Sequence, residues 1–175
     1  MTNSSVRYSA LPAEAPTFGF RRAVRAEDAD AVERLVRATG AFNEAEVAIA
    51  RELVDEALTK GEKASGYSFL FADGVDRLDG YTCYGPIPGT VRRTELYWIA
   101  VHPNVQRTGL ARRLQAASED AARAEGALRM TAETSTRPDY ASARSFYLAQ
   151  GYTLLADIPD WHDDGDGMAI YGKIL

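Results

Sequence analysis

The segment from Glu95 to Gly126 reads ELYWIAVHP, then NVQRTGLA, then RRLQAASEDAARAEG. The first part is apolar enough for a central strand, the second is a short polar turn, and the third has the spacing of an amphipathic helix. The turn contains a glycine just before the predicted helix begins. A helix N-terminus exposes unpaired N–H groups and a partial positive charge, so this turn is suited to binding a phosphate group.

Two common phosphate-binding patterns are absent from the chain. No GxxxxGK[ST] occurs, which excludes a Walker-type nucleotide loop, and no GxGxxG occurs, which excludes a dinucleotide fingerprint. The turn instead reads QRTGLA, from Gln106 to Ala111, after Val101-His102-Pro103. This arrangement resembles the GNAT superfamily of acetyl-CoA-dependent N-acetyltransferases, whose signature is Q/R-x-x-G-x-G/A after a strand that ends in a V-x-P-like turn.

The composition is that of an ordinary globular domain. Of 175 residues, 46% are hydrophobic and 26% are charged, and the net charge is −5. This acidic balance argues against a nucleic-acid partner, and no long apolar run predicts a membrane span. A single cysteine, Cys83, fits a reducing cytoplasm. Residues 1–16 are polar and small, which predicts a flexible N-terminal arm before a single domain at 17–175.

The spacing of apolar residues predicts the order β-α-α-β-β-β-α-β-α-β-β, with an acidic WHDDGDG linker between the last two strands. The expected strands are 18–24, 68–72, 80–84, 95–101, 128–132, 153–158 and 168–175, and the expected helices are 26–39, 44–59, 110–126 and 140–150. The GNAT fold has the same order. The resemblance therefore implies an α/β (α+β) fold with a mixed, mostly antiparallel sheet and helices on both faces. Its fourth and fifth strands would splay apart to leave a slot for the cofactor.

The resemblance also implies which residues hold acetyl-CoA. The loop amides would cradle the pyrophosphate, and the strand backbone from Ile99 to Val101 would pair with the pantetheine arm. Arg107, Arg112 and Arg113 would meet the phosphates, although the last two fit a solvated helix face equally well. The expected cofactor-binding residues are Ile99, Ala100, Val101, Gln106, Arg107, Thr108, Gly109, Leu110, Ala111, Arg112 and Tyr140.

Tyr147 is the expected acid. It lies in SFYLAQGY, residues 145–152, which resembles the F-Y-x-x-x-G-F/Y segment of GNAT enzymes. There the tyrosine commonly protonates the departing thiolate, and a phenol with a pKa near 10 still holds its proton at neutral pH. Packing against the core is the alternative. Seven residues earlier, where the family often has an asparagine that contacts the cofactor arm, this chain has Tyr140.

Glu95 is the expected base, because acetyl transfer needs a neutral amine. It lies eleven residues before Gln106, which matches the catalytic glutamate of many GNAT enzymes. It would accept the proton directly or through an ordered water. The structural alternative is an ion pair with Arg92, Arg93 or Arg129.

Three other features favour structural roles. His102 fits a loop histidine, and Cys83 fits core packing on a strand better than an acyl-cysteine intermediate. His162 lies among aspartates, but its segment departs from the EF-hand pattern and fits an exposed acidic loop, so no metal is expected.

The sequence therefore predicts a cytoplasmic acyltransferase that moves the acetyl group of acetyl-CoA to a primary amine, by direct attack in a ternary complex. A small molecule is the expected acceptor, and a homodimer through the last strands is plausible. A protein N-terminal or lysine acetyltransferase and a non-catalytic acyl-CoA-binding module stay open. Loop residues that would favour a cationic amine, or else form a solvated acidic surface, are Phe42, Asn43, Glu44, Glu46, Tyr84, Asp157, Asp160 and Trp161.

Overall fold

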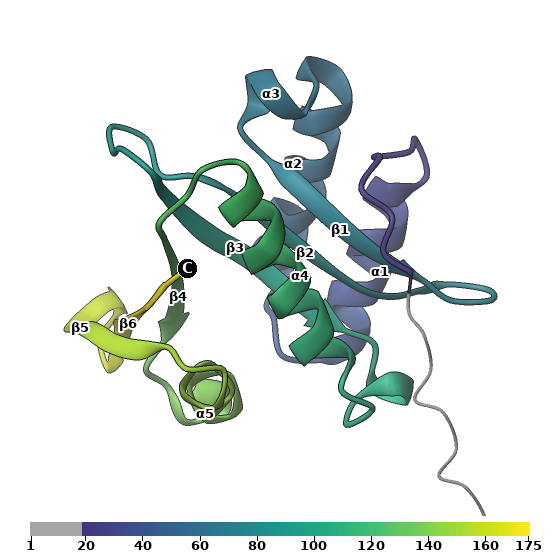
Figure 1. Cartoon of the computed structure of the whole chain (residues 1–175). Helices are drawn as coiled ribbons and strands as arrows, with labels where there is room; N and C mark the ends of the chain where they lie inside the picture. The colour runs from purple at the N-terminus through teal and green to yellow at the C-terminus, as the bar shows by residue number, and fades with distance from the viewer. Residues whose placement is uncertain (1–18) are drawn as a thin grey trace, which may run out of the picture.

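The structure is a computed structural model that describes residues 19–175, so the arm predicted at 1–16 lies outside the described residues. Its helices pack against one twisted sheet (Figure 1). The helices are α1 Asp28–Thr39, α2 Glu44–Lys60, α3 Glu62–Ser65, α4 Leu110–Ala124 and α5 Ala141–Ala149, with short 3-10 helices at Pro103–Val105 and Pro138–Tyr140. The strands are β1 Ser68–Asp73, β2 Leu78–Pro86, β3 Arg93–Val101, β4 Arg129–Ser135, β5 Thr153–Asp163 and β6 Asp166–Ile174.

Within residues 19–175, six strands form one mixed sheet in the order β1-β2-β3-β4-β6-β5. Only β3 and β4 run parallel, and the other neighbours are antiparallel. The parallel pair needs a long crossover connection, which α4 provides. The predicted mixed, mostly antiparallel sheet is confirmed.

Each face of the sheet has its own apolar core. Side chains of a strand alternate between faces, so Phe69 and Phe71 pack with α1 and α2, whereas Leu70 and Ala72 pack with Leu110 of α4. Figure 1 shows α4 in front of β2 and β3, with α1 and α2 behind them. The prediction of helices on both faces is therefore confirmed.

The sheet opens between β3 and β4. Their pairing runs only from Arg93 opposite Arg129 to Leu96 opposite Ala132. The next residue, Tyr97, is a bulge against β2, since the register there passes from Leu96 opposite Tyr84 to Trp98 opposite Cys83. A bulge bends its strand and increases the local twist. The two strands consequently diverge after Leu96 (Figure 1), and the predicted splay is confirmed.

The strand predicted at 18–24 is wrong. Phe18 lies outside the described residues, and the rest of the segment forms a single antiparallel bridge, Arg21 to Phe71. The side chain of Arg21 is bound to Asp28 at 2.8 Å and to Asp73 at 2.9 Å. These ion pairs fix the segment to the start of α1 and the end of β1. The alternation of apolar residues at 18–24 therefore does not mark a strand of the sheet.

The acidic linker predicted between the last strands is also wrong. β5 continues to Asp163, and Asp163 pairs with Asp166 across a two-residue turn. Asp160 has φ 53° and its carboxylate accepts the N–H of Gly165 at 2.7 Å, which closes an irregular hairpin. The segment is polar because most of this strand is exposed, and its composition therefore suggested a linker. Within residues 19–175, none of the helices is both long and apolar enough to cross a bilayer.

Candidate active site

The loop before α4 presents a row of backbone donors. α4 begins at Leu110, and its N-cap, Gly109, has φ 87° and offers no side chain to cap the helix. Arg107 also has a positive φ, 65°. Within residues 19–175, the N–H groups from Arg107 to Arg112 have no backbone acceptor. Alternating right- and left-handed residues point successive N–H groups toward one concave side, which is the geometry that binds phosphate.

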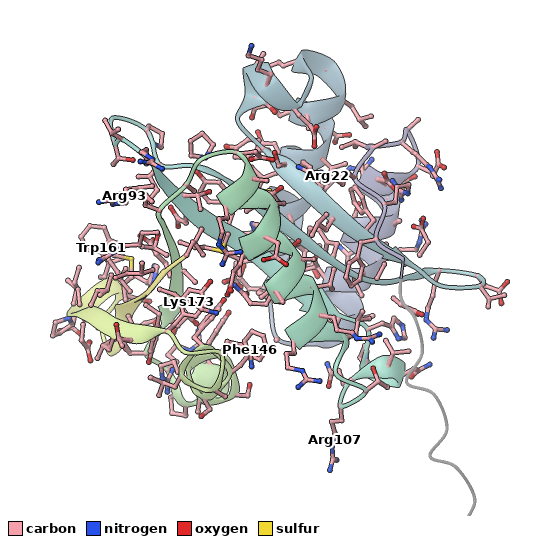
Figure 2. All side chains as sticks on the ribbon, viewed as in Figure 1. Arg22, Arg93, Arg107, Phe146, Trp161 and Lys173 are labelled. Carbon is pink, nitrogen blue, oxygen red and sulfur yellow. The ribbon has the colours of Figure 1, made fainter. Side chains whose placement is uncertain are left out.

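Two exposed arginines add positive charge to this loop. The side chain of Arg107 extends away from the ribbon (Figure 2). Among the described residues, neither Arg107 nor Arg112 has an acidic partner. A cavity of about 350 Å³ lies beside the loop, lined by residues that include Gln106, Arg107, Gly109, Arg112 and Phe146. Both guanidinium groups are thus available to an anion in that cavity.

The loop side chains fix the local backbone. The Gln106 amide donates to the carbonyl of Val101 at 3.2 Å, and the Thr108 hydroxyl donates to the carbonyl of Val105 at 2.7 Å. Leu110 is buried in the core beneath the loop. These contacts anchor both ends of the loop while leaving its N–H groups uncovered.

The gap between β3 and β4 continues from this loop as a groove. A cavity of about 430 Å³ is lined by the end of β3, the loop and α5. The sequence-predicted residues that line it are Ile99, Ala100, Val101, Gln106, Arg107, Ala111 and Tyr147. Because β3 has no partner strand on this side after Leu96, its backbone there is open to an extended ligand.

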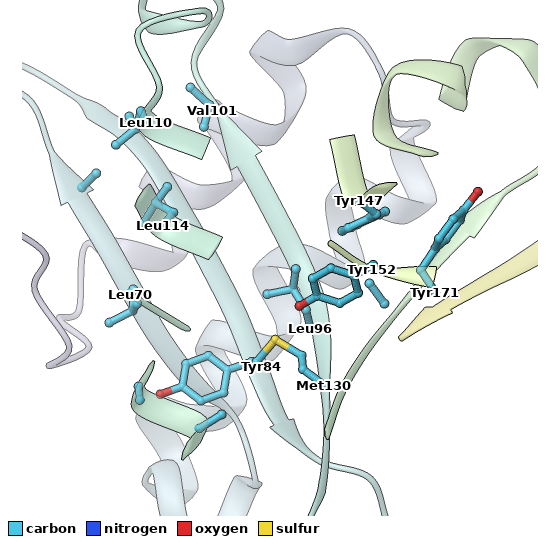
Figure 3. Close-up of a cluster of buried hydrophobic side chains, with 14 of the residues drawn as sticks. Leu70, Tyr84, Leu96, Val101, Leu110, Leu114, Met130, Tyr147, Tyr152 and Tyr171 are labelled. Atoms are coloured by element: carbon cyan, nitrogen blue, oxygen red, sulfur yellow. The ribbon is translucent and has the colours of Figure 1, made fainter. Parts of the chain in front are cut away.

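Tyr147 lies where this groove meets a second cavity. Its side chain is only 6% exposed, yet it lines both spaces. Its ring stacks on Tyr171 at 5.7 Å and contacts Tyr152 at 5.7 Å, and Figure 3 shows the three rings together near Leu96. No hydrogen bond to the Tyr147 hydroxyl is formed within residues 19–175. Burial raises the pKa of Tyr147, so the phenol stays protonated and free to donate.

Glu95 lies on β3 just before the splay. Burial raises the pKa of Glu95 to about 7, and the nearby charge of Glu133 adds to the shift. The alternative ion pairs with Arg92, Arg93 and Arg129 are not formed within residues 19–175. Arg92 instead donates to the carbonyl of Gly126, and Arg93 to those of Val91 and Arg92. Glu95 itself does not line the second cavity, but Tyr97, two residues along on the same strand, does.

The second cavity has a volume of about 380 Å³ and lies on the α1–α2 side of the splay. Its walls come from the α1–α2 loop, the ends of β3 and β4, and the β5–β6 hairpin. The residues that line it are Phe42, Asn43, Glu46, Tyr97, Trp98, Ile99, Glu133, Thr134, Ser135, Arg137, Tyr140, Ala143, Tyr147, His162 and Asp166. A cavity of this size can enclose a small organic molecule.

The loop residues expected at an acceptor site divide into two groups. Phe42, Asn43 and Glu46 line the second cavity, as expected. The remaining residues do not line it: Glu44, Tyr84, Asp157, Asp160 and Trp161. Glu44 pairs with Arg37 at 2.8 Å, and Tyr84 is buried in the core on the α4 face.

Sequence reasoning missed Glu133, Trp98 and His162 as cavity residues. A signal for Glu133 existed, because Met130 and Ala132 alternate toward the core and Glu133 must then face the other way. No comparable signal existed for Trp98, whose orientation depends on the bulge at Tyr97.

Tyr140 lies in the second cavity rather than in the groove. Its hydroxyl lies within hydrogen-bonding distance of two acceptors, the carboxylate of Glu46 at 3.1 Å and the carbonyl of Ala41 at 3.2 Å, and its one proton is shared between them. Burial and the charge of Glu46 raise the pKa of Tyr140 to about 12. The hydroxyl thus ties α5 to the α1–α2 loop, and a contact with the cofactor arm stays a prediction.

The other polar candidates lie apart from Tyr147. His102 accepts the N–H of Asn104 at 3.2 Å and lines a separate cavity of about 520 Å³ beside α1. Cys83 is buried in the core, and burial raises the pKa of its thiol well above the ordinary value. Cys83 is therefore not placed to attack a thioester at the splay, and His102 is not placed to accept a proton there.

The chain matches the family model described as acetyltransferase (GNAT) family over residues 38–152, and it therefore belongs to that family. A search of curated proteins gave no match. Among solved structures, one from Desulfovibrio desulfuricans that is assigned to GNAT acetyltransferases is 42% identical, with a TM-score of 0.87. The match covers 90% of this chain and 99% of that one.

Two more distant structures share the fold. An aminoglycoside 6'-N-acetyltransferase in complex with coenzyme A is 16% identical with a TM-score of 0.69, covering 89% of this chain and 96% of that one. A ribosomal-protein-alanine N-acetyltransferase from Brucella melitensis is 20% identical with a TM-score of 0.71, covering 89% and 99%. Their differing acceptors mean that the fold alone does not choose between a small molecule and a protein.

Proposed function

We propose that this GNAT-family protein transfers the acetyl group of acetyl-CoA to a primary amine of a small molecule, by direct attack in a ternary complex. The observation that carries the proposal is that Tyr147 lies between two cavities. One continues to the uncovered N–H groups before α4, and the other has the size of a small ligand. A phosphate-bearing thioester and an amine would then meet at one phenol.

Two residues would handle the protons. As the amine nitrogen bonds to the thioester carbonyl carbon, its proton passes to Glu95, directly or through water. As the carbon–sulfur bond breaks, Tyr147 gives its proton to the thiolate. A carboxylate with a pKa of about 7 is matched to a base that works near neutral pH. A backbone N–H near Ile99 to Val101 would polarise the carbonyl.

The volume of the second cavity favours a small acceptor. A cavity of about 380 Å³, bounded by Phe42 on one side and the β5–β6 hairpin on another, is suited to a compact molecule rather than to an extended peptide. A protein acetyltransferase is the second candidate, and efficient acetylation of peptides over small amines would favour it. The buried thiol of Cys83 is compatible with a cytoplasmic location, which is part of the proposal.

Thermal stability with added ligands tests the cofactor. The midpoint of unfolding should rise with acetyl-CoA and with CoA but not with NADH or ATP, since a ligand that binds only the folded state stabilises it. Gly109→Glu is the control, because it puts a side chain and a negative charge at a residue with φ 87° in the loop. Absence of a shift with both CoA forms in the wild-type protein would overturn the proposed function.

A further inference from the structure

The second cavity carries an excess of negative charge. Its lining includes the carboxylates of Glu46, Glu133 and Asp166 and a single guanidinium, Arg137. Arg137 is already paired, with Asp139 at 3.1 Å and Asp166 at 3.8 Å. Within residues 19–175, neither Glu46 nor Glu133 forms an ion pair. Two carboxylates therefore face the cavity without a cation of the protein to balance them.

These two carboxylates come from opposite walls. Glu133 is on β4 beside the splay, and its charge acts on Glu95. Glu46 is in the first turn of α2, where one oxygen accepts the N–H of Asn43 at 2.8 Å and the other accepts the hydroxyl of Tyr140 at 3.1 Å. Both bonds hold the Glu46 carboxylate in a fixed orientation at the wall formed by the α1–α2 loop and α5.

Aromatic rings line the same wall as Glu46. Phe42 directly precedes the α2 N-cap, and its ring packs on Trp98 with centroids 5.0 Å apart. Tyr140 joins them through its bond to Glu46. An ammonium group is attracted both by a carboxylate and by the faces of aromatic rings. This wall therefore has the chemistry of a cation subsite.

The reacting amine cannot be the cation that this subsite holds. It has to lose its proton to attack, and a carboxylate that held it as an ammonium would oppose that loss. In the proposed function its place is beside Tyr147, where its proton passes to Glu95 directly or through water. A cation at the Glu46 wall would accordingly be a second, non-reacting group of the same acceptor.

We propose that the acceptor is a diamine or a related amine with a second cationic centre, and that Glu46, with Phe42 and Trp98, binds this distal cation while the other amine reacts. The inference rests on the proposed function. An amino acid is disfavoured as acceptor, because its carboxylate would meet Glu46 and Glu133 and find Arg137 already paired. Glu46 is thus a residue that determines acceptor specificity rather than one that moves protons.

Glu46→Gln removes the negative charge of this side chain while keeping its size. Glutamine at the third position of a helix preserves a capping box, so the bonds between this side chain and Asn43 can persist. Its amide NH2 can then donate to the Tyr140 oxygen, while the Tyr140 hydroxyl keeps the carbonyl of Ala41 as its acceptor. Glu56→Gln is the matched control, because Glu56 is on the same helix, pairs with Lys60 and does not line the cavity.

The test compares α,ω-diaminoalkanes from propane to hexane with monoaminoalkanes of equal length and with ω-amino acids. Calorimetric titration into the protein–CoA complex measures binding, and CoA release measures kcat/KM. At least one diamine should bind about tenfold more tightly than its monoamine, consistent with a partly desolvated ion pair and cation–π contact. The preference should vanish in Glu46→Gln and persist in Glu56→Gln.

Equal binding of diamines and monoamines, a preference that survives Glu46→Gln, or tighter binding of the amino acids would each overturn the inference. Failure of the proposed function has a different signature, because no amine would then release CoA. Calorimetry measures the preference for diamines without turnover. It therefore tests the inference whether or not the protein acetylates any amine.

Discussion

Burial acts on two titratable residues at the site with opposite chemical consequences. It raises the pKa of the Glu95 carboxyl to about 7, which makes that group a better proton acceptor near neutral pH. It raises the pKa of the Tyr147 phenol further above neutrality, which keeps that group protonated. In the proposed mechanism, one physical cause thus separates the base, Glu95, from the acid, Tyr147.

Replacing Tyr147 by phenylalanine should remove the acid and preserve the packing. The ring would still contact Tyr152 and Tyr171, and the lost hydroxyl has no hydrogen-bond partner within residues 19–175 to leave unsatisfied. We expect kcat to fall about tenfold or more with little change in KM for acetyl-CoA. Steady-state kinetics check this, and unchanged turnover would remove Tyr147 from the mechanism.

The rate should depend on pH through Glu95. The base works when it is ionised, so kcat/KM should rise as pH increases through about 7, the pKa of Glu95. Glu95→Gln should lose this inflection. It should retain only the rise at higher pH that occurs when the ammonium form of the acceptor loses its proton. A pH–rate profile with the same acceptor for both proteins checks the prediction.

Glu133→Gln is the companion variant for that profile. Removing the charge of Glu133 should lower the pKa of Glu95 and move the inflection to lower pH, because a like charge disfavours ionisation. An inflection near 7 that persists in Glu95→Gln would assign it to another group.

The element that organises the site is the turn from β3 into α4, and its dependence on Gly109 can be measured. Gly109→Ala creates no close contact, since the nearest atom to an added Cβ is on Arg112 at 3.8 Å, but the backbone has φ 87°. We expect a loss of about 1 kcal/mol in stability and a loss of CoA affinity on the order of tenfold, as the loop N–H groups turn away.

Gly126→Ala is the matched control for the loop. Gly126 has φ 94° just after the other end of α4, with open space where a Cβ would stand. Denaturant unfolding should show a comparable loss of stability in both variants, whereas calorimetric titration should show weaker CoA binding in Gly109→Ala only. Equal CoA affinity in the two variants would mean that the loop conformation is unimportant for binding.

Elements with strong periodicity could be predicted from the sequence, and those set by tertiary contacts could not. The strand, turn and helix from Glu95 to Gly126 follow from apolar spacing and one glycine, and all three are present. The segment at 18–24 alternates like a strand, but ion pairs of Arg21 hold it outside the sheet. The hairpin through Asp160 and Asp163 is polar because it is exposed, which is why composition suggested a linker.

For the site, residues close together in the chain were easier to predict than residues that converge in space. The loop from Gln106 to Ala111 is one continuous motif. The second cavity instead joins Phe42, Trp98, Glu133 and His162, which come from four separate elements. Which of their side chains converge depends on the splay of β4, which the GNAT resemblance implied only in outline, and on the bulge at Tyr97, which has no signature in the sequence.

At the scale of the whole molecule, the site occupies the junction of two halves of the sheet. β1 to β3 carry α1, α2 and α4, while β4 to β6 form a second unit with α5 beside it (Figure 1). Only four residues of β3 are paired in register with residues of β4. This narrow junction leaves the backbone of β3 open to the groove, whose opposite side is lined by α5 and Tyr147.

Mass spectrometry of a panel of small amines, after incubation with acetyl-CoA and the protein, tests the central claim most directly. We predict that at least one amine gains one acetyl group, that free CoA appears in equal amount, and that both products fall about tenfold or more in Tyr147→Phe. Binding of CoA without an acetylated product from any amine in the panel would contradict the account and point to a non-catalytic CoA-binding protein.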